Sequence, residues 1–590
     1  MPTLTVDEIK VEVPDGTTIL QAARQAGAKV PSLCYLENVQ TIGACRVCLV
    51  EVEGAKALVA SCAAPVADGM VVKTNSPLAR KGRQSVVELL LSEHDGNCQT
   101  CARSADCELR TLARDLGIDE IRYEGEKTMR KVDDSTPALI RDTGKCIMCR
   151  RCVTVCNETQ GVGGLFPQGR GFTTVIGPAF ASDLADVTCV QCGQCAAVCP
   201  VGAITERDQI DRVWAALDDP DKHVVVQTAP AIRAALGEGF DYEPGTLVTG
   251  KMVSALRRLG FDGVFDTNFA ADLTIIEEGT ELLTRLKKAL VDQQDVALPM
   301  FTSCSPGWIN YMEHYNPDFL GNLSTCKSPQ QMFGAVAKTY YAEKLGKRPE
   351  DVFVVSVMPC TAKKFECQRP EMDASGVQDV DVVLTTRELV RMIKQGGIDF
   401  ASLPDDTMDR PLGLSTGAAD IFANTGGVME AALRTVYEIV TGQPFPFENL
   451  HVKPIAGLEG VKEAEVTFTE TLPEWSFLKG VTAKVAVAHT LGNAQKVIDA
   501  VRSGEKTYHF IEVMTCPGGC IGGGGQPRLT SDAVRQARIA AIYAEDEHRE
   551  LRKSHENPAV QKLYEEFLVK PLGEKSHHLL HTKYSKKERV

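Results

Sequence analysis

Two stretches of the chain, CIMCRRCVTVC at 146–156 and CVQCGQCAAVCP at 189–200, carry the same cysteine pattern. Each has the spacing C-x2-C-x2-C-x3-C, with which cysteine thiolates bind 4Fe-4S clusters. Where this run occurs twice in one fold, the fourth cysteine of each run binds the other cluster. The pattern predicts two 4Fe-4S clusters, one on Cys146, Cys149, Cys152 and Cys199 and one on Cys156, Cys189, Cys192 and Cys195.

Another cysteine group lies near the N-terminus and has the spacing C-x10-C-x2-C-x13-C. Gly43 and Ala44 keep its loop small, so that backbone amides can approach the sulfurs of a cluster. The loop is similar to that of plant-type 2Fe-2S ferredoxins, with altered intervals. We expect a 2Fe-2S cluster on Cys34, Cys45, Cys48 and Cys62.

The residues before this loop predict a small domain of strands and one helix. Residues 3–13 alternate between apolar and polar side chains as a strand does, and Pro14-Asp15-Gly16 predicts a turn. The stretch ILQAARQAG that follows has a helical pattern closed by Gly27. A strand-turn-strand-helix arrangement is therefore expected.

The helical run SVVELLLSEHDGNC leads into a group of four ligands with the spacing H-x3-C-x2-C-x5-C. Imidazole and thiolate are ligands that both iron and zinc accept, so a zinc site is the alternative. Because cluster motifs lie on both sides in the sequence, a 4Fe-4S cluster is favoured. Its ligands would be His94, Cys98, Cys101 and Cys107.

Cysteine usage supports metal binding in this part of the chain. Fifteen of the 21 cysteines precede residue 200, and with His94 they supply enough ligands for four clusters. Disulfides are the alternative, but they are rare in a long chain without a secretion signal. This part of the chain resembles the large iron-sulfur subunit of respiratory complex I and the cluster arms of some formate dehydrogenases. It predicts electron transfer without selecting a reaction.

Bulk properties exclude several classes of partner. The 590 residues are too many for one core, so several domains are expected. The net charge of −14 argues against nucleic acid and against an anionic membrane surface. The start MPTLTVDEIKVEV lacks the basic and apolar regions of a signal peptide, and no stretch reaches the length of a membrane span. A cytoplasmic location is expected.

From about residue 210 the chain alternates short apolar strands with helical patterns, which predicts parallel α/β sheets in two lobes. In such sheets, binding sites form beyond the carboxyl ends of strands. Four predicted strands, HVVVQT, ALPMF, DVFVVSVM and HFIEVM, end at Ala229-Pro230, Thr302-Ser303-Cys304, Pro359-Cys360 and Thr515-Cys516. Sparse cysteines at strand ends predict one shared metal site.

Three of these strand ends belong to longer motifs, FTSCSPGW, VMPCTAKKFE and FIEVMTCPGGCIGGGGQP. They resemble the three signature motifs of FeFe-hydrogenases. The resemblance continues through SPQQMFG, NTGGVMEAALR and LRKSHENPAVQKLYEEF and so covers essentially the whole chain. It is similar to clostridial-type enzymes with a full set of accessory clusters, and equally to the catalytic subunit of NADP-reducing complexes.

The resemblance implies an H-cluster, a 4Fe-4S cubane joined through a cysteine sulfur to a di-iron unit with carbonyl, cyanide and a bridging dithiolate. The cubane ligands it implies are Cys360, Cys516 and Cys520, with Cys520 as the bridge. Lys363 would donate a hydrogen bond to a cyanide. Protons would pass along Cys304, Glu278, Ser324, Glu281 and Arg285. Other side chains expected around the cofactor are Ala229, Pro230, Ser328, Gln330, Met358 and Met514.

One position departs from the family pattern. The family has two adjacent cysteines before the proline, the first for proton transfer and the second for the cubane, whereas this chain has Cys304 followed by Ser305. Serine oxygen is a harder and more basic iron ligand than thiolate. Either Ser305 binds the cubane, or Cys304 does and the relay begins differently. We take Cys304 as the relay residue.

Other features predict structure more than chemistry. Cys326 and Cys367 are expected to be small buried residues. Glycines 522–525 predict backbone packed closely around the cofactor rather than a phosphate loop. The histidines His577, His578 and His581 near the end are expected to lie in an exposed tail.

The predicted fold is a multidomain combination of α+β and α/β units. It comprises a 2Fe-2S β-grasp ferredoxin domain (1–78), a 4Fe-4S domain with one histidine and three cysteine ligands (79–125), a two-cluster 4Fe-4S ferredoxin domain (126–209), a two-lobed α/β H-cluster domain (210–530) and a C-terminal helical segment (531–590). The predicted cofactors are one 2Fe-2S cluster, three accessory 4Fe-4S clusters and the H-cluster.

The predicted function is reversible conversion of protons and electrons to H2. The alternatives are the catalytic subunit of an NAD(P)-linked electron-bifurcating complex and a non-catalytic hydrogen sensor or cluster-assembly relative. No convincing dinucleotide fingerprint is present. Electrons would therefore be exchanged with ferredoxin or with a partner subunit that binds flavin or NAD(P).

Overall fold

The computed structural model describes residues 1–127, 130–445, 460–528 and 530–589. Its internal contacts divide the chain into two compact units. The first comprises Met1–Glu158, Gly163–Cys189 and Val198–Thr205, and the second comprises Thr159–Val162, Val190–Ala197 and Glu206–Val590. Among the described residues, no helix is long and apolar enough to cross a membrane.

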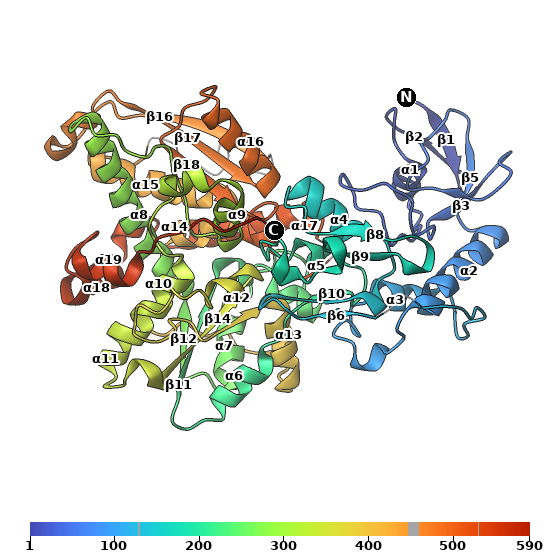
Figure 1. Cartoon of the computed structure of the whole chain (residues 1–590), viewed down its shortest axis with the longest axis horizontal. Coiled ribbons are helices and arrows are strands. Elements are labelled where there is room, and N and C mark those ends of the chain that lie inside the picture. The colour runs from blue at the N-terminus through green and yellow to red at the C-terminus, as the bar shows by residue number, and fades with distance from the viewer. Residues whose placement is uncertain (128–129, 446–459, 529, 590) are drawn as a thin grey trace. The chain divides into compact units, whose positions relative to one another are not determined.

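The first unit begins with a five-stranded sheet (Figure 1). Its strands are β1 (Thr3–Val6), β2 (Ile9–Glu12), β3 (Leu49–Val52), β4 (Val59–Ala60) and β5 (Val71–Lys73), in the order β2-β1-β5-β3-β4. Helix α1 (Ile19–Gln25) follows β2 and ends at Gly27, whose φ of +81° suits glycine. The predicted strand-turn-strand-helix arrangement is confirmed.

The expected position of the first turn is wrong. Residues 3–13 do not form one strand, because the chain turns at Asp7 and Glu8, which have φ angles of +45° and +73°. Val6 and Ile9 then face each other in an antiparallel hairpin. Such two-residue turns usually contain Asn or Gly, and Asp-Glu lacks that signal.

The rest of the first unit is built from short elements around the cysteines. Helix α2 (Pro77–Glu93) is capped by the Ser76 side chain and runs to His94, and α3 (Glu108–Asp115) starts after Cys107. The short strands form a three-stranded sheet in the order β10-β7-β6 and a hairpin. These elements are β6 (Val132–Asp133), β7 (Leu139–Asp142), β10 (Ile204–Glu206), β8 (Phe166–Gln168), β9 (Val175–Gly177) and α4 (Arg151–Thr154). Helix α5 (Gln194–Val198), which follows in the cysteine-rich part of the chain, belongs to the second unit except for its last residue.

The second unit contains two four-stranded sheets, as the sequence predicts. The first is wholly parallel, in the order β12-β11-β14-β15, and its strands are β11 (His223–Thr228), β12 (Gly263–Asp266), β14 (Val352–Met358) and β15 (Val382–Thr385). The second has the order β13-β18-β17-β16, with β13 (Met300–Phe301), β16 (Val461–Thr467), β17 (Thr482–His489) and β18 (Phe510–Met514).

Two details of the second sheet differ from the prediction of parallel strands. Strand β16 pairs antiparallel with β17. Strand β13 is shorter than the predicted ALPMF strand, since Pro299 has no amide hydrogen to offer a ladder. The strand ends that carry the motifs are nevertheless where the sequence predicts them.

Helices enclose both sheets and bury their apolar side chains in two large clusters. The longest is α8 (Thr267–Leu290), which starts at the end of β12, where the Asp266 carboxylate accepts a hydrogen bond from the Asn268 amide. The other α-helices between residues 210 and 445 are α6 (Ile210–Leu217), α7 (Thr249–Leu259), α9 (Pro306–Tyr315), α10 (Pro329–Val336), α11 (Ala342–Lys344), α12 (Ala362–Glu366), α13 (Thr386–Gln395), α14 (Gly417–Asp420) and α15 (Gly427–Thr441).

The C-terminal segment is helical but is not an exposed tail. It contains α17 (Asp532–His548), α18 (Pro558–Leu563) and α19 (Glu574–Leu580). Earlier in the chain, α16 (Leu491–Arg502) connects strands β17 and β18 of the second sheet. His577 and His578 are exposed, as expected. His581 is buried, because the backbone around it pairs with the backbone around Cys326. The prediction is wrong for this histidine.

Candidate active site and cluster-binding cysteines

The four cysteines of the N-terminal loop lie together and are all buried. The Cys34 thiol is hydrogen-bonded to the thiols of Cys45 and Cys62, and the Cys48 thiol is hydrogen-bonded to that of Cys62. These bonds lower the pKa of Cys34, and the Cys45 and Ala44 amides lower it further. Small residues in the loop thus let backbone amides reach the sulfurs, as the sequence predicts. The group suits a cluster whose thiolates need hydrogen bonds.

His94 and its three cysteines line one cavity in the first unit. The Nε2 atom of His94 is buried and has no hydrogen-bond partner among the described residues. Burial lowers the pKa of this imidazole, so the neutral form that can bind a metal is favoured. A Cβ atom on Gly202, another lining residue, would lie 2.6 Å from the Cys101 sulfur. The orphaned nitrogen and this close approach fit a metal centre at this place.

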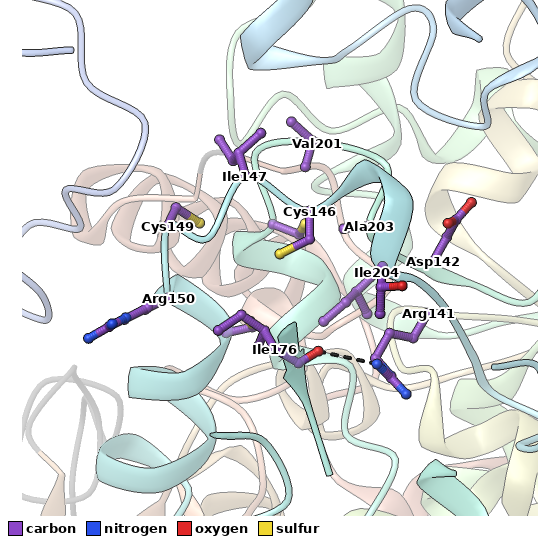
Figure 2. Close-up of a pocket in the computed structure, with 13 residues that line it drawn as sticks. Arg141, Asp142, Cys146, Ile147, Cys149, Arg150, Ile176, Val201, Ala203 and Ile204 are labelled. Atoms are coloured by element: carbon purple, nitrogen blue, oxygen red, sulfur yellow. Dashed lines mark hydrogen bonds between the residues drawn. The ribbon is translucent and has the colours of Figure 1, made fainter. Parts of the chain in front are cut away.

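A second cavity of the first unit brings together the four cysteines that the crossed pattern assigns to one cluster. Figure 2 shows Cys146 and Cys149 with their sulfurs directed into it, and its lining also includes Cys152 and Cys199. Burial raises the pKa of Cys146 to about 12. Among the lining residues, Arg141 donates to the Ile176 carbonyl at 3.2 Å. Of the other predicted set, Cys156 and Cys189 belong to the first unit and Cys192 and Cys195 to the second.

In the second unit, the predicted cubane cysteines follow two strands, one from each sheet. Cys360 comes after β14, and Cys516 and Cys520 come after β18. Burial raises the pKa of Cys516 well above its usual value, and the charges of Cys360, Cys192 and Cys520 add to this effect. The thiols are therefore close enough to interact, and a cationic metal centre would relieve their repulsion.

The glycine run after Cys520 packs against backbone, as expected. A Cβ atom on Gly522 would lie 2.0 Å from the Pro517 carbonyl oxygen, and one on Gly523 would lie 2.2 Å from that of Pro359. These glycines hold the loops of Cys360 and Cys516 close together. Larger side chains would force the two cysteine loops apart.

A segment of the last cluster motif, residues 190–197, is part of the same unit and contacts these loops. The Thr361 hydroxyl donates to the Gln191 carbonyl at 2.8 Å, and the Gln194 amide donates to the Gly522 carbonyl at 3.0 Å. A Cβ atom on Gly524 would lie 2.3 Å from the Cys192 carbonyl oxygen. A cysteine of the predicted electron relay thus lies beside the predicted cubane cysteines.

Lys363 lies on α12, one turn after Cys360, and is nearly buried. Its Nζ atom is 2.8 Å from Glu366 Oε2 and donates to the Cys304 carbonyl at 3.1 Å. Ser328 and Gln330 also donate to Glu366, at 2.9 and 3.1 Å. Gln330 Oε1 is buried without a hydrogen-bond partner among the described residues. The lysine is thus held beside the Cys304 backbone, and the Gln330 side-chain oxygen can accept a further hydrogen bond.

The structure brings four residues of the predicted proton path into contact with one another: Glu278, Ser324, Glu281 and Arg285. Glu278 bonds to the Ser324 side chain and to the Ser303 amide, which precedes Cys304. Ser324 donates to Glu281 at 3.1 Å, and Arg285 Nη2 is 2.7 Å from Glu281 Oε1. Glu278 and Glu281 are buried on α8, whereas Arg285 is partly exposed. The residues form a series of contacts from the Ser303 amide, beside the partly buried Cys304, towards solvent at Arg285.

The electrostatics of this chain favour protonated groups inside. Burial raises the pKa of Glu278 to about 8, although the Ser324 hydrogen bond opposes the change. Burial also raises the pKa of the Cys304 thiol, and the charge of Glu278 adds to this, while Lys363 opposes it. Both groups therefore favour their protonated forms at neutral pH, as members of a proton path would.

The side chain of Ser305 contacts the loop that carries Cys516. Its hydroxyl is 2.8 Å from the Thr515 hydroxyl, next to Cys516 in sequence. Both residues remain candidates for the fourth cubane ligand, because Cys304 and Ser305 lie at the same loop. The charge of Cys520 is among those that raise the pKa of Cys304.

The remaining predicted residues line strand ends and are buried. Ala229 and Pro230 follow β11, and the Ala229 amide donates to the Val357 carbonyl at 3.0 Å. Met358 and Met514 are the last residues of β14 and β18. Cys326 and Cys367 are buried in the first core cluster, as expected.

Three residues of the site lie outside the prediction. Glu366 is held by Lys363, and its position three residues later on a short helix is the one available signal. Glu512 accepts the Gly426 and Met429 amides at 2.7 Å and thereby fixes the start of α15. His581 bonds to Thr325 and Glu277 from the far end of the chain. No sequence pattern near Glu512 or His581 predicts these contacts.

Family models match almost the whole chain. They are a 2Fe-2S iron-sulfur cluster binding domain (1–77), the NADH-ubiquinone oxidoreductase-G iron-sulfur binding region (83–122), a 4Fe-4S dicluster domain (145–203), the C-terminal domain of the iron only hydrogenase large subunit (222–524) and the iron hydrogenase small subunit (532–587). The match at 83–122 favours iron-sulfur over zinc at His94. These domains define an iron-sulfur oxidoreductase.

Relatives and solved structures agree with these models. The NADP-reducing hydrogenase subunit HndD of Solidesulfovibrio fructosivorans is 53% identical and covers 100% of both chains. Iron hydrogenase 1 of Clostridium pasteurianum is 41% identical over 99% of this chain and 100% of its own. A solved structure of apo FeFe-hydrogenase HydA1 from Chlamydomonas reinhardtii covers 63% of this chain and 98% of its own, with 46% identity and a TM-score of 0.57. The chain belongs to the iron-only hydrogenase family and acts on hydrogen.

Proposed function

We propose that this chain is the catalytic subunit that converts two protons and two electrons to H2, and the reverse, with a defined set of residues for each step. The observation that carries the proposal is the series of contacts from the Ser303–Cys304 loop through Glu278, Ser324 and Glu281 to Arg285. A relative used only for cluster assembly would not need buried, protonated groups in this order.

The thiolates of Cys360, Cys516 and Cys520 would hold the H-cluster, with Ser305 as the fourth ligand because Cys304 is assigned to the proton path. When bound, this group supplies the iron centre at which electrons and protons combine. Lys363 contributes a cation in a buried pocket, where it can donate to an anionic ligand. Glu366 positions the lysine by accepting its second hydrogen bond.

Protons move through groups whose protonated forms the fold favours. The Cys304 thiol holds a proton at Sγ, and Glu278 is the next acid in the chain. The Ser324 hydroxyl is hydrogen-bonded to both Glu278 and Glu281, and a hydroxyl can accept a proton from one acid while it donates to the other. Arg285 keeps Glu281 oriented at the exit. The path works in either direction, as reversible catalysis requires.

Electrons would travel through four accessory clusters held by the fifteen N-terminal cysteines and His94. Residues 190–197 of the last cluster motif contact the loops of Cys360 and Cys516, which supports electron transfer from this motif to the H-cluster. We also retain the proposed domain ranges 1–78, 79–125, 126–209, 210–530 and 531–590. The relative from Solidesulfovibrio is a subunit of an NADP-reducing hydrogenase, which supports an NAD(P)-binding partner subunit over free ferredoxin as the electron partner.

The test is infrared spectroscopy and gas evolution on anaerobically matured protein. We expect carbonyl and cyanide bands and hydrogen evolution from reduced viologen. Protein with confirmed iron loading that shows neither would contradict a catalytic function. Bands without turnover would favour the hydrogen-sensor alternative.

A further inference from the structure

Next to the proposed proton exit lies a buried cluster with three kinds of metal ligand. Glu281, Cys326 and His581 each place one ligand atom within 4.8 Å of the ligand atoms of the other two. All three side chains are buried. The set combines a carboxylate oxygen, a thiol sulfur and an imidazole nitrogen, which are the ligand types of Zn2+ sites.

The fold fixes these residues from three distant segments. Glu281 lies on α8, Cys326 lies in the loop before α10, and His581 follows α19. The two loop segments are tied by backbone hydrogen bonds, from the Lys327 amide to the Leu580 carbonyl and from the Thr582 amide to the Thr325 carbonyl, both 2.7 Å. The cluster is therefore positioned by backbone pairing and not only by its side chains.

The surroundings of His581 match those of a metal-binding histidine. Its Nε2 atom is 3.2 Å from Glu277 Oε2, and its Nδ1 atom is 2.8 Å from the Thr325 hydroxyl. Histidines that bind metals usually donate their second ring N–H to a carboxylate, which orients the ring. Glu277 is itself held by the Tyr564 hydroxyl at 2.6 Å and the Leu572 amide at 2.8 Å. Nδ1 is thus the atom free to turn from Thr325 to a metal.

We propose that Glu281, Cys326 and His581 bind one Zn2+ ion, and that this ion blocks the proton path by occupying the Glu281 carboxylate. On binding, the Cys326 thiol releases its proton to solvent and the thiolate bonds to the ion. The Thr325 hydroxyl, 3.1 Å from Glu281 Oε2 and 2.8 Å from His581 Nδ1, would supply an oxygen for a fourth position. The carboxylate and thiolate together balance the charge of the ion. The block rests on the proposed function, whereas the site itself does not.

The first test measures zinc in the matured holoenzyme, in which the clusters occupy the other metal-binding cysteines. After equilibration with Zn2+ and removal of loose metal, we expect one zinc per chain. Zinc X-ray absorption should show one sulfur ligand together with nitrogen and oxygen. Absence of retained zinc, or a shell without sulfur, overturns the site.

Matched variants locate the ion. His581→Gln keeps a hydrogen-bonding side chain but removes the imidazole, whereas His578→Ala changes an exposed histidine of the same segment. We expect His578→Ala to bind zinc as the unchanged enzyme does. Glu277→Gln should weaken binding about 10- to 100-fold, and His581→Gln should weaken it further. Equal binding by all variants overturns the assignment.

Measurements of hydrogen evolution test whether bound zinc blocks the proton path, independently of whether the zinc site exists. We expect Zn2+ to inhibit turnover of the unchanged enzyme reversibly, with a chelator restoring it, and to inhibit His581→Gln only at concentrations at least about 100-fold higher. If zinc is bound with one sulfur ligand and turnover is unaffected, the metal site stands but protons do not leave through Glu281. Should His581→Gln fail to mature, the X-ray absorption of the unchanged enzyme and the Glu277→Gln affinity still decide the site.

Discussion

The two units of the molecule build their sites in different ways. In the first, most ligands of a group come from a short piece of chain, such as the four cysteines between Cys34 and Cys62. In the second, the proton path joins α8, the loop after β13 and the loop before α10. Metal ligation can be read from spacing, whereas a proton path exists only once the chain has folded.

Buried acids of the two units illustrate two opposite outcomes. In the first unit, Asp133 is buried, but hydrogen bonds from Ser135 and the Leu184 amide outweigh burial and lower its pKa. In the second unit, burial dominates at Glu278 and Asp272 and raises their pKa values to about 8 and about 7. Other buried acids of the second unit, such as Glu277 and Glu313, have lowered pKa values because their partners' hydrogen bonds outweigh burial. The raised pKa therefore distinguishes Glu278 and Asp272 from their neighbours and not one unit from the other.

The largest effect that would sharpen this comparison is expected from Glu278→Gln. The amide has the shape of the acid but cannot carry its proton, so hydrogen evolution should fall about 100- to 10,000-fold. Infrared bands and the cluster signals in electron paramagnetic resonance should be unchanged. The control is Asp272→Asn on the same helix, which removes a buried acid outside the path and should leave most of the turnover. Equal losses in both variants would mean that burial alone, and not the path, matters.

A smaller effect on turnover is expected in the first unit from His94→Ala. Loss of the imidazole removes one of four ligands, so the protein should lose about four iron atoms per chain. Hydrogen evolution with viologen should fall only several-fold, since small donors can reach other clusters. His94→Cys should restore the iron content. Full iron content in His94→Ala would show that this histidine is structural.

The smallest effect concerns stability against pH. The folded chain keeps the Asp272 proton up to about pH 7, whereas the unfolded chain loses it near pH 4, so this group makes stability decline as pH rises between these values. The melting temperature should therefore be lower at pH 7.5 than at pH 5, in addition to the contributions of other groups. Asp272→Asn should reduce this slope. An unchanged slope in the variant would show that Asp272 is charged when folded.

The sequence predicted the order of the elements and the grouping of several cysteines. The repeated cysteine spacing, with the fourth cysteine of each run crossing to the other group, anticipated that Cys146, Cys149, Cys152 and Cys199 line one cavity. The strand ends at Cys360 and Cys516 followed from apolar runs that stop just before these residues. The proton path required the family resemblance, since Glu278 and Glu281 alone would indicate a solvated face.

What the sequence did not predict depends on contacts between distant segments. His581 is buried through pairing with residues near Cys326, about 255 positions earlier, and the nearby His577 and His578 are exposed. Glu512 was missed because its partners are backbone amides, which leave no mark in composition. The turn at Asp7 and Glu8 was missed because neither residue favours positive φ, although the break in alternation between Val6 and Ile9 was a usable signal.

The central claim is that Cys304 carries protons to a site held by other cysteines, and Cys304→Ala tests it most directly. Infrared spectra and hydrogen evolution should be measured on the same matured sample, with Cys367→Ala as a control for loss of a buried thiol. We expect the carbonyl and cyanide bands to remain while turnover falls at least about 100-fold. Loss of the bands together with the cubane iron would contradict the account and make Cys304 the fourth ligand.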